Sequence, residues 1–196
     1  MANKDLTVIA SGGDGDGYAI GMGHTIHALR RNMNMTYIVM DNQIYGLTKG
    51  QTSPSSAKGF VTKSTPKGNI EKNVAPLELA LSSGATFVAQ GFSSDIKALT
   101  KMIEDAIHHD GFSFVNVFSP CVTYNKVNTC DWFKAHLTSI DDIEGYDITD
   151  KQLAMKTVLD HESLVKGIVY QDTTTPSYES QISELEHEAL AKRDIH

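Results

Sequence analysis

The sequence predicts an α/β fold, with a mostly parallel sheet and helices on both of its faces. Short apolar, β-branched runs alternate along the chain with stretches that repeat apolar residues at helical spacing. The first of these runs ends in a glycine-rich turn, which is typical of a strand that leads into a helix. Strands that alternate with helices pair in parallel, and 196 residues can bury a sizeable core, so one α/β domain with room for an appendage is expected.

The first strand is expected at residues 6–10, which are apolar and lead into Ser11-Gly12-Gly13. Residues 18–32 predict a helix with two arginines near its end, where positive charge suits the helix dipole. A second buried strand at residues 36–40 completes a βαβ unit. The helix side chains expected to face inward are Ile20, Ile26 and Leu29.

A connection rich in Gly, Ser, Thr, Pro and Lys spans residues 46–73. A loop of this length in a compact domain is usually functional or mobile. Its hydroxyl-rich part, residues 51–58, suggests either a lid over a substrate or an ordinary mobile loop. A helix at 76–83 and a strand at 86–89 are expected next.

The clearest amphipathic helix is predicted at residues 95–108, with Ser94 as its N-cap. Its apolar residues recur at helical spacing, so they should share one buried face. That face is predicted to hold Ile96, Leu99, Ile103, Ala106 and Ile107.

A further strand is expected at residues 112–118, and beyond Pro120 the pattern weakens. Residues 130–137 and 152–161 suggest short helices. The polar stretch 176–196 fits a docking helix or a frayed tail.

Composition excludes several classes of protein. A net charge of −7 argues against a general nucleic-acid binder, which would show a basic face. Two cysteines without CxxC spacing give no disulfide framework and favour a reducing, cytoplasmic setting. The N-terminal apolar run is too short for a signal peptide, and no stretch approaches membrane-spanning length.

Glycines and acids follow the first two predicted strands. Gly13-Asp14-Gly15-Asp16-Gly17 comes after the first and Asp41-Asn42 after the second, and 26 residues (16–41) separate Gly15 from Asn42. Glycines let backbone N–H groups approach phosphate, and carboxylate and amide oxygens are the ligands that Mg²⁺ prefers. The pattern therefore suggests a cradle for a magnesium diphosphate.

Other interpretations of this glycine turn stay open at this point. A plain tight turn fits the first loop alone equally well. A nicotinamide fingerprint is disfavoured because Asp14 and Asp16 would repel a pyrophosphate unless a metal intervened. A Walker loop is excluded, since no GK[ST] follows.

Three segments together resemble the β subunit of the 2-oxoacid:ferredoxin (or flavodoxin) oxidoreductases, particularly the 2-oxoglutarate branch. They read GGDGDGYAIGMGHTIHALRRN, YIVMDNQIYGLTKGQTSPSS and FSPCVTYNK. The similarity runs from about Leu6 to about Tyr170 and includes the thiamine-diphosphate signature. It implies a thiamine-diphosphate-binding α/β domain at 1–125 and a partly helical, subunit-docking extension at 126–196.

The resemblance also implies roles for particular residues. Mg²⁺ would be held by Asp14, the Asn42 side chain and the backbone carbonyl of Ile44. Lys49 would meet a substrate carboxylate, unless it is simply a solvated loop lysine. The residues implied to line thiamine diphosphate are Gly13, Asp14, Gly15, Asp16, Asn42, Ile44, Gly46, Leu47 and Thr48.

Cys121 has two possible roles. On sequence alone it would be a small buried side chain. By resemblance, the cysteine of a Ser-Pro-Cys segment is one of four thiolates that hold a [4Fe-4S] cluster. The family's other three cysteines lie upstream and are not in this sequence, so we expect either a truncated subunit or a cluster segment supplied separately, and no cluster on this chain alone. Cys130 is expected to be structural.

The implied reaction is oxidative decarboxylation of a 2-oxoacid, with 2-oxoglutarate favoured, to acyl-coenzyme A. Electrons would pass to ferredoxin or flavodoxin, and an α subunit would supply a glutamate for cofactor activation. The chain alone should therefore not turn over. Two alternatives remain: a non-redox thiamine-diphosphate-dependent decarboxylase or synthase, and an inactive fragment that serves only assembly.

Overall fold

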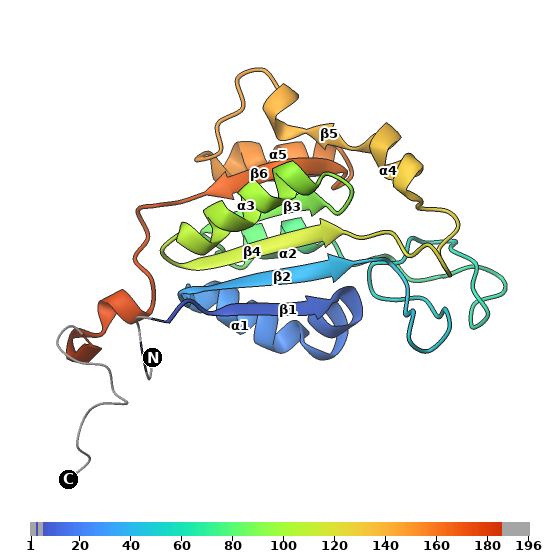
Figure 1. The fold of residues 1–196 in the computed structure, drawn as a ribbon, viewed down its shortest axis with the longest axis horizontal. Helices are drawn as coiled ribbons and strands as arrows, with labels where there is room; N and C mark the ends of the chain where they lie inside the picture. Colours follow the sequence, from blue (N-terminus) through green and yellow to red (C-terminus); the bar gives the residue numbers. More distant parts are fainter. Residues whose placement is uncertain (1–2, 4–5, 186–196) are drawn as a thin grey trace, which may run out of the picture.

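The computed structural model describes residue 3 and residues 6–185. Within that part, six strands form one sheet in the order β1-β2-β4-β3-β6-β5 (Figure 1). The strands are β1 (Ile9–Gly13), β2 (Met35–Asp41), β3 (Phe87–Phe92), β4 (Phe112–Phe118), β5 (Thr138–Ser139) and β6 (Val165–Gln171). The helices are α1 (Met22–Arg31), α2 (Pro76–Ser82), α3 (Ile96–His108), α4 (Cys130–His136) and α5 (Lys151–Asp160).

The predicted α/β class is confirmed. Strands β1, β2, β4 and β3 pair in parallel, and β6 pairs antiparallel with β3. Every residue of β3 and β4 is buried, which explains why these two strands read as mostly apolar runs without alternation.

Helices cover both faces of the sheet, as expected (Figure 1). One apolar cluster packs α1, α2 and α5 against one face, with Phe114 and Val88 among its sheet residues. A second packs α3 against the other face through Met102 and Ala106. A third, formed by Phe92, Phe118 and Phe133, holds α4 near the carboxyl ends of the central strands.

The first predicted helix is broken. A π-helical turn, η1 (Asp16–Ile20), precedes α1, and Gly21 lies between them. A Cβ at Gly21 would stand 2.4 Å from the Asp16 carbonyl oxygen, so this wide turn needs glycine. Because the turn shifts the helical register, the prediction that Ile20 faces inward is wrong: 95% of that side chain is exposed.

The amphipathic helix is confirmed over Ile96–His108, but its cap and the start of its face were predicted wrongly. Asp95, not Ser94, is the N-cap, and its carboxylate accepts a hydrogen bond from the Ala98 N–H at 3.4 Å. Ile96, in the first turn, is 73% exposed. The inward contacts come from Leu99, Met102 and Ala106.

Beyond Pro120 the two predicted helices are confirmed as α4 and α5, but strands β5 and β6 were missed. Lys166 and Gly167 interrupt the apolar pattern of β6, which hid that strand in the sequence. The division near residue 125 stays a prediction.

At the end of the described chain, two 3₁₀ turns, η3 (Glu179–Gln181) and η4 (Ser183–Leu185), occupy part of the stretch where a docking helix or tail was expected. Residues 186–196 of that stretch lie outside the described residues. A third 3₁₀ turn, η2 (Ile140–Asp142), follows β5. None of the described helices is long and apolar enough to cross a bilayer.

Candidate functional site

The segments that hold the predicted site residues start at the carboxyl edge of the parallel strands. Gly13 at the end of β1 is in register with Met40, and Asp41 at the end of β2 is in register with Phe118. The segments that leave β1, β2 and β4 are therefore neighbours. The Ser119 N–H, for example, donates to the Asp41 carbonyl oxygen at 2.8 Å.

The first loop is a tight turn closed by its own acid. The Asp16 carboxylate accepts a hydrogen bond from the Gly13 N–H at 2.9 Å. Asp16 therefore folds back onto the loop backbone. Gly15 lies against the Tyr45 ring, where a Cβ would stand only 2.1 Å from a ring carbon.

Gly15→Ala should displace Tyr45 and the turn that carries Asp14. We expect a loss of about 1–3 kcal/mol of unfolding free energy, as for other overpacked sites, measured by urea denaturation. Gly23→Ala is the matched control, because no atom lies within 4 Å of a Cβ there and Gly23 is within α1. That control should stabilise the protein by about 0.5–1 kcal/mol. Equal effects for the two variants would contradict the steric account.

Two buried acids face each other across the loops. Asp14, only 3% exposed, accepts hydrogen bonds on Oδ2 from the Ser53 hydroxyl at 2.5 Å and the Ser55 hydroxyl at 2.6 Å. Ser55 Oγ also lies 2.7 Å from Asp41 Oδ1. A hydroxyl has one hydrogen to donate, so its contact with the second acid needs a proton on a carboxyl group.

Asp41 is the acid suited to carry that proton. Complete burial, and then the nearby charge of Asp14, raise its pKa to about 7, although hydrogen bonds from Ser55, Asn116 and Gln43 oppose the shift. The Asn116 amide links Asp41 to the core. It donates to Asp41 at 3.5 Å and to the Gln90 side chain at 2.9 Å.

The second loop begins at Asn42. Its side-chain oxygen accepts from the Ile44 N–H at 3.0 Å, and Ile44 is buried. The chain then turns back on itself, since the Tyr45 N–H donates to the Gln51 carbonyl at 3.0 Å.

The tip of this loop carries the remaining predicted contacts. Leu47 and Thr48 are exposed, and so is Lys49, which has a positive φ of 74°. The Lys49 N–H donates to the Gly46 carbonyl at 3.0 Å. The tip therefore presents an apolar and a cationic side chain to solvent.

Asp14, the Asn42 side chain and the Ile44 carbonyl fit a bound Mg²⁺ by the chemistry of their donor atoms. One carboxylate, one amide oxygen and one backbone carbonyl are the hard oxygen ligands of a magnesium site. Such a site needs no cluster of acids, and among the described residues no group of three or more His, Cys, Asp and Glu could hold a metal. Asp14 and Asn42 follow the neighbouring strands β1 and β2.

The residues present do not fit an iron–sulfur cluster. Such a cluster needs four thiolates, and the sequence has only Cys121 and Cys130. Partial burial raises the pKa of the Cys121 thiol. The N–H groups of Tyr124, Thr123 and Asn125 and the charge of Lys126 outweigh that effect, so the pKa is lowered overall.

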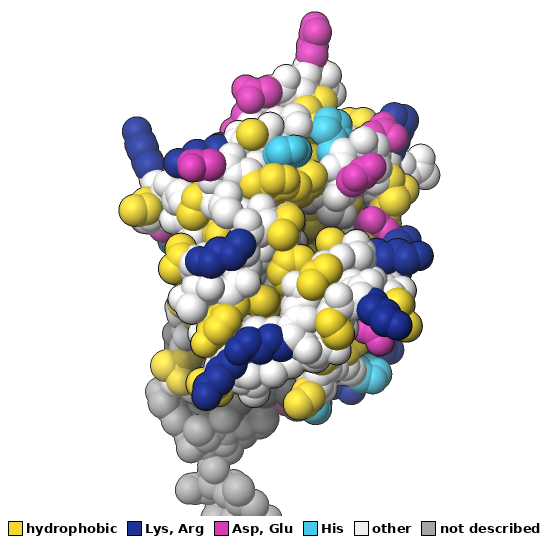
Figure 2. Space-filling model, turned by 90° about the vertical axis from the view of Figure 1, so that its right-hand side faces the viewer, with side chains coloured by type: hydrophobic (Ala, Val, Ile, Leu, Met, Phe, Trp, Pro, Cys, Tyr) yellow, Lys and Arg dark blue, Asp and Glu magenta, His cyan; other side chains and the backbone are white. Residues whose placement is uncertain are grey.

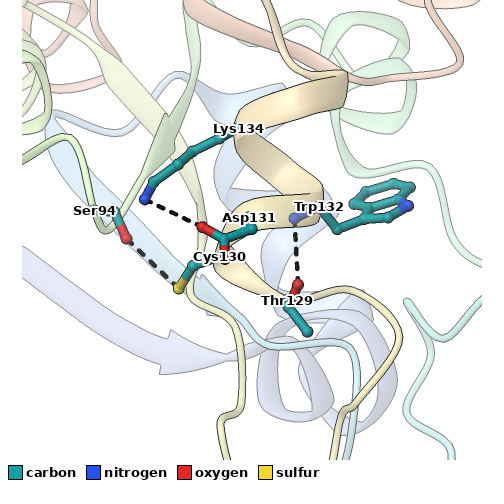
Figure 3. Close-up of polar contacts among 6 residues, drawn as sticks. All are labelled: Ser94, Thr129, Cys130, Asp131, Trp132 and Lys134. Atoms are coloured by element: carbon teal, nitrogen blue, oxygen red, sulfur yellow. Dashed lines mark hydrogen bonds and ion pairs between the residues drawn. The ribbon is translucent and has the colours of Figure 1, made fainter.

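Cys130 lies in the first turn of α4, and Figure 3 shows its sulfur directed at Ser94. The Ser94 hydroxyl donates to this sulfur at 3.6 Å, so it ties α4 to the segment before α3 instead of capping that helix. The Thr129 hydroxyl caps α4 by accepting from the Trp132 N–H at 3.2 Å (Figure 3). Cys130 also packs against the cluster of Phe92, Phe118 and Phe133, and its structural role stays a prediction that this packing supports.

Sequence reasoning missed the partners of the two acids. The hydroxyl-rich residues 51–58 suggest, from sequence alone, a lid or a mobile loop. Ser53, Ser55 and Ser56 are instead buried, and Ser56 donates to the Gln43 carbonyl at 2.6 Å. For Asn116 the sequence does offer one indication of a buried polar role, since it is the only amide side chain in the apolar strand FSFVNVF.

Comparison with protein families gives two matches. Residues 1–117 match the C-terminal TPP-binding domain of thiamine pyrophosphate enzymes. Residues 121–187 match the C-terminal part of the pyruvate ferredoxin oxidoreductase β subunit.

Individual relatives agree with these matches. The chain is 42% identical over 192 residues to a Sulfolobus 2-oxoacid:ferredoxin oxidoreductase subunit β, covering 93% of this chain and 63% of the relative. It is 38% identical over 157 residues to the 2-oxoglutarate synthase subunit KorB of Archaeoglobus fulgidus, covering 76% and 58%.

A solved structure of 2-oxoglutarate:ferredoxin oxidoreductase from Magnetococcus marinus, with 2-oxoglutarate, coenzyme A and succinyl-CoA bound, is also similar. Its TM-score is 0.88 at 39% identity, covering 94% of this chain and 62% of that chain. The chain thus spans less than two thirds of the length of these proteins. The thiamine-diphosphate-binding type of fold is confirmed.

Proposed function

Because the chain belongs to the β-subunit family of the 2-oxoacid:ferredoxin oxidoreductases, we propose that it holds magnesium and thiamine diphosphate for the oxidative decarboxylation of a 2-oxoacid. The substrate is 2-oxoglutarate, coenzyme A takes the acyl group, and ferredoxin takes the electrons. The observation that carries this proposal is Asp14, a buried acid at the end of β1, beside the loop that starts with Asn42.

The site residues divide the work of binding. Asp14, the Asn42 side chain and the Ile44 carbonyl hold Mg²⁺, which neutralises charge where acids would otherwise repel a diphosphate. When bound, thiamine diphosphate supplies the electron-accepting chemistry that decarboxylation requires. The residues proposed to line it are Gly13, Gly15, Asp16, Gly46, Leu47 and Thr48.

Lys49 is proposed to select the substrate. It is exposed at the loop tip, only a few residues from the Mg²⁺ ligands, with no ion pair within 4.0 Å among the described residues. A cation there pairs with the distal carboxylate of a dicarboxylic 2-oxoacid. This placement favours 2-oxoglutarate over monocarboxylic 2-oxoacids.

Asp14→Asn tests the cofactor site. Titration calorimetry with Mg²⁺ and thiamine diphosphate, on the chain with its α subunit, should show affinity reduced at least about 100-fold, since loss of even an outer-shell partner costs about 10–100-fold. Asp131→Asn, on the exposed face of α4, should bind as the parent does. Unchanged affinity in Asp14→Asn would refute the site.

A reaction assay separates the remaining alternatives. The assembled enzyme should reduce ferredoxin or a viologen when 2-oxoglutarate and coenzyme A are added together. Release of CO₂ without reduction would instead indicate a non-redox decarboxylase. Normal assembly without any cofactor binding would indicate an assembly fragment.

A further inference from the structure

Residues 53–56, which we call the serine turn, lie inside the connection between β2 and α2. The three serines of this turn, Ser53, Ser55 and Ser56, are each at most 6% exposed, and so is Asp14, which two of them contact. Figure 2 looks onto the carboxyl edge of the sheet: the middle of this face shows hydrophobic and uncharged atoms, and most of the acidic side chains in view lie toward its upper part and right side. The serine hydroxyls therefore act on an acid that is buried with them.

The backbone of the serine turn is fixed in place. The Ser56 N–H donates to the Ser53 carbonyl at 3.0 Å, and the Ser53 N–H donates to the Ser56 hydroxyl at 2.8 Å. The Val74 N–H donates to the Pro54 carbonyl at 2.8 Å, which joins the turn to the segment just before α2. The hydroxyls of Ser53 and Ser55 are thus carried on a rigid frame.

Two of these hydroxyls converge on one oxygen of Asp14. Oδ2 accepts from Ser53 at 2.5 Å and from Ser55 at 2.6 Å, whereas no described residue donates to Oδ1. Two donors on one oxygen fix the plane of the carboxylate and leave its other oxygen for another ligand. Carboxylates that bind metals in proteins are usually held by hydrogen bonds of this kind.

The third hydroxyl acts on the second loop of the site. Ser56 donates to the Gln43 carbonyl at 2.6 Å. Gln43 stands between the two proposed ligands of this loop, Asn42 and Ile44, and has a φ of 60°, a left-handed conformation that is uncommon outside glycine. Its N–H donates to the Asp41 carboxyl group at 3.2 Å. The backbone between the two proposed ligands is therefore held from both sides.

From these contacts we propose that the serine turn is the outer shell of the magnesium site. Ser53 and Ser55 are positioning residues for Asp14, and Ser56 positions the backbone that carries the other two ligands. The inference rests on the proposed function, which supplies the metal. Mg²⁺ demands a near-ideal octahedral arrangement of oxygens, whereas Ca²⁺ accepts a flexible one, so a carboxylate that is set in advance favours Mg²⁺.

Two other roles for the serines make different predictions. If the hydroxyls only tie the long connection to the sheet, their loss lowers stability and leaves the metal affinity of the folded protein unchanged. If they instead compete with the metal for Asp14, their loss makes metal binding tighter. Only a positioning role predicts weaker binding that is specific for the more demanding ion.

The test is Ser53→Ala, in the chain co-produced with its α subunit. Titration calorimetry in the presence of thiamine diphosphate should show Mg²⁺ affinity reduced about 10–100-fold, as for other outer-shell partners. Ca²⁺ affinity should fall less, so that the ratio of Mg²⁺ to Ca²⁺ affinity drops at least about threefold. Ser55→Ala is a second, independent variant with the same expected direction, and melting temperatures without metal show that each variant folds.

Ser113→Ala is the matched control. Ser113 is also buried, but it lies at the other end of β4, where its hydroxyl donates to the Ala106 carbonyl at 2.7 Å. This control also loses a buried hydroxyl, and a loss that acts only on the fold should leave both metal affinities within about twofold of the parent.

Several results would overturn the inference. These are unchanged or tighter Mg²⁺ binding in the serine variants, equal losses for Mg²⁺ and Ca²⁺, and an equal loss in Ser113→Ala. If the parent binds Mg²⁺ with thiamine diphosphate and the serine variants bind equally well, the outer shell alone is refuted. If the parent itself binds neither ion, the proposed function fails and the inference falls with it.

Discussion

Asn116→Leu is expected to lower the free energy of unfolding by about 3–5 kcal/mol, measured by urea denaturation, although leucine has a similar volume. Asn116 is completely buried in β4. It accepts from the Tyr18 hydroxyl at 2.6 Å and donates to Gln90 at 2.9 Å and to Asp41 at 3.5 Å. Leucine would leave these buried groups without that partner, at about 1–3 kcal/mol for each unsatisfied group.

A control on the same strand isolates this effect. Ser113 is equally buried, but its hydroxyl makes one hydrogen bond, to the Ala106 carbonyl at 2.7 Å. Ser113→Ala should therefore cost only about 1 kcal/mol. Similar losses for the two variants would mean that Asn116 contributes one hydrogen bond and no network.

Regular patterns explain why so much of the fold could be predicted. The apolar, β-branched or aromatic runs at β2 and β4 and the helical spacing of α3 extend over enough residues to indicate a strand or a helix, so their type was predicted correctly. Parallel pairing then places the carboxyl ends of β1, β2, β4 and β3 at one edge, which is why residues as distant as Asp14 and Asp41, which both contact Ser55, could be predicted to lie together.

Other features depend on tertiary contacts that a single segment does not reveal. Strand β6 is stabilised by pairing with β3 and by the Gln90 amide, which donates to the Val165 carbonyl at 2.7 Å. The contacts of Ser53 and Ser55 with Asp14 join residues about 40 positions apart. Nothing in the local sequence indicates that these serines turn inward.

Asp41→Asn should remove a pH dependence of stability in the metal-free protein, measured as melting temperature in EDTA between pH 4 and pH 9. The folded pKa of Asp41 is raised to about 7 from 3.8, first by burial and then by Asp14, so the folded state holds a proton that the unfolded state releases above about pH 4. The protonated Asp41 carboxyl therefore makes its full contribution to the free energy of unfolding below about pH 4. That contribution is lost as the pH rises through about 7.

The size of this effect follows from the same shift. Three pKa units correspond to about 4 kcal/mol, and imperfect replacement of the hydrogen bonds leaves a net gain of about 1–3 kcal/mol for Asp41→Asn at pH 8. At pH 4 the variant should be no more stable than the parent, because the parent's carboxyl is already neutral. Asp131→Asn, on an exposed helix face, should keep the slope of the parent. Parallel melting curves for Asp41→Asn and the parent across this range would contradict a protonated Asp41 between Ser55 and Asn116.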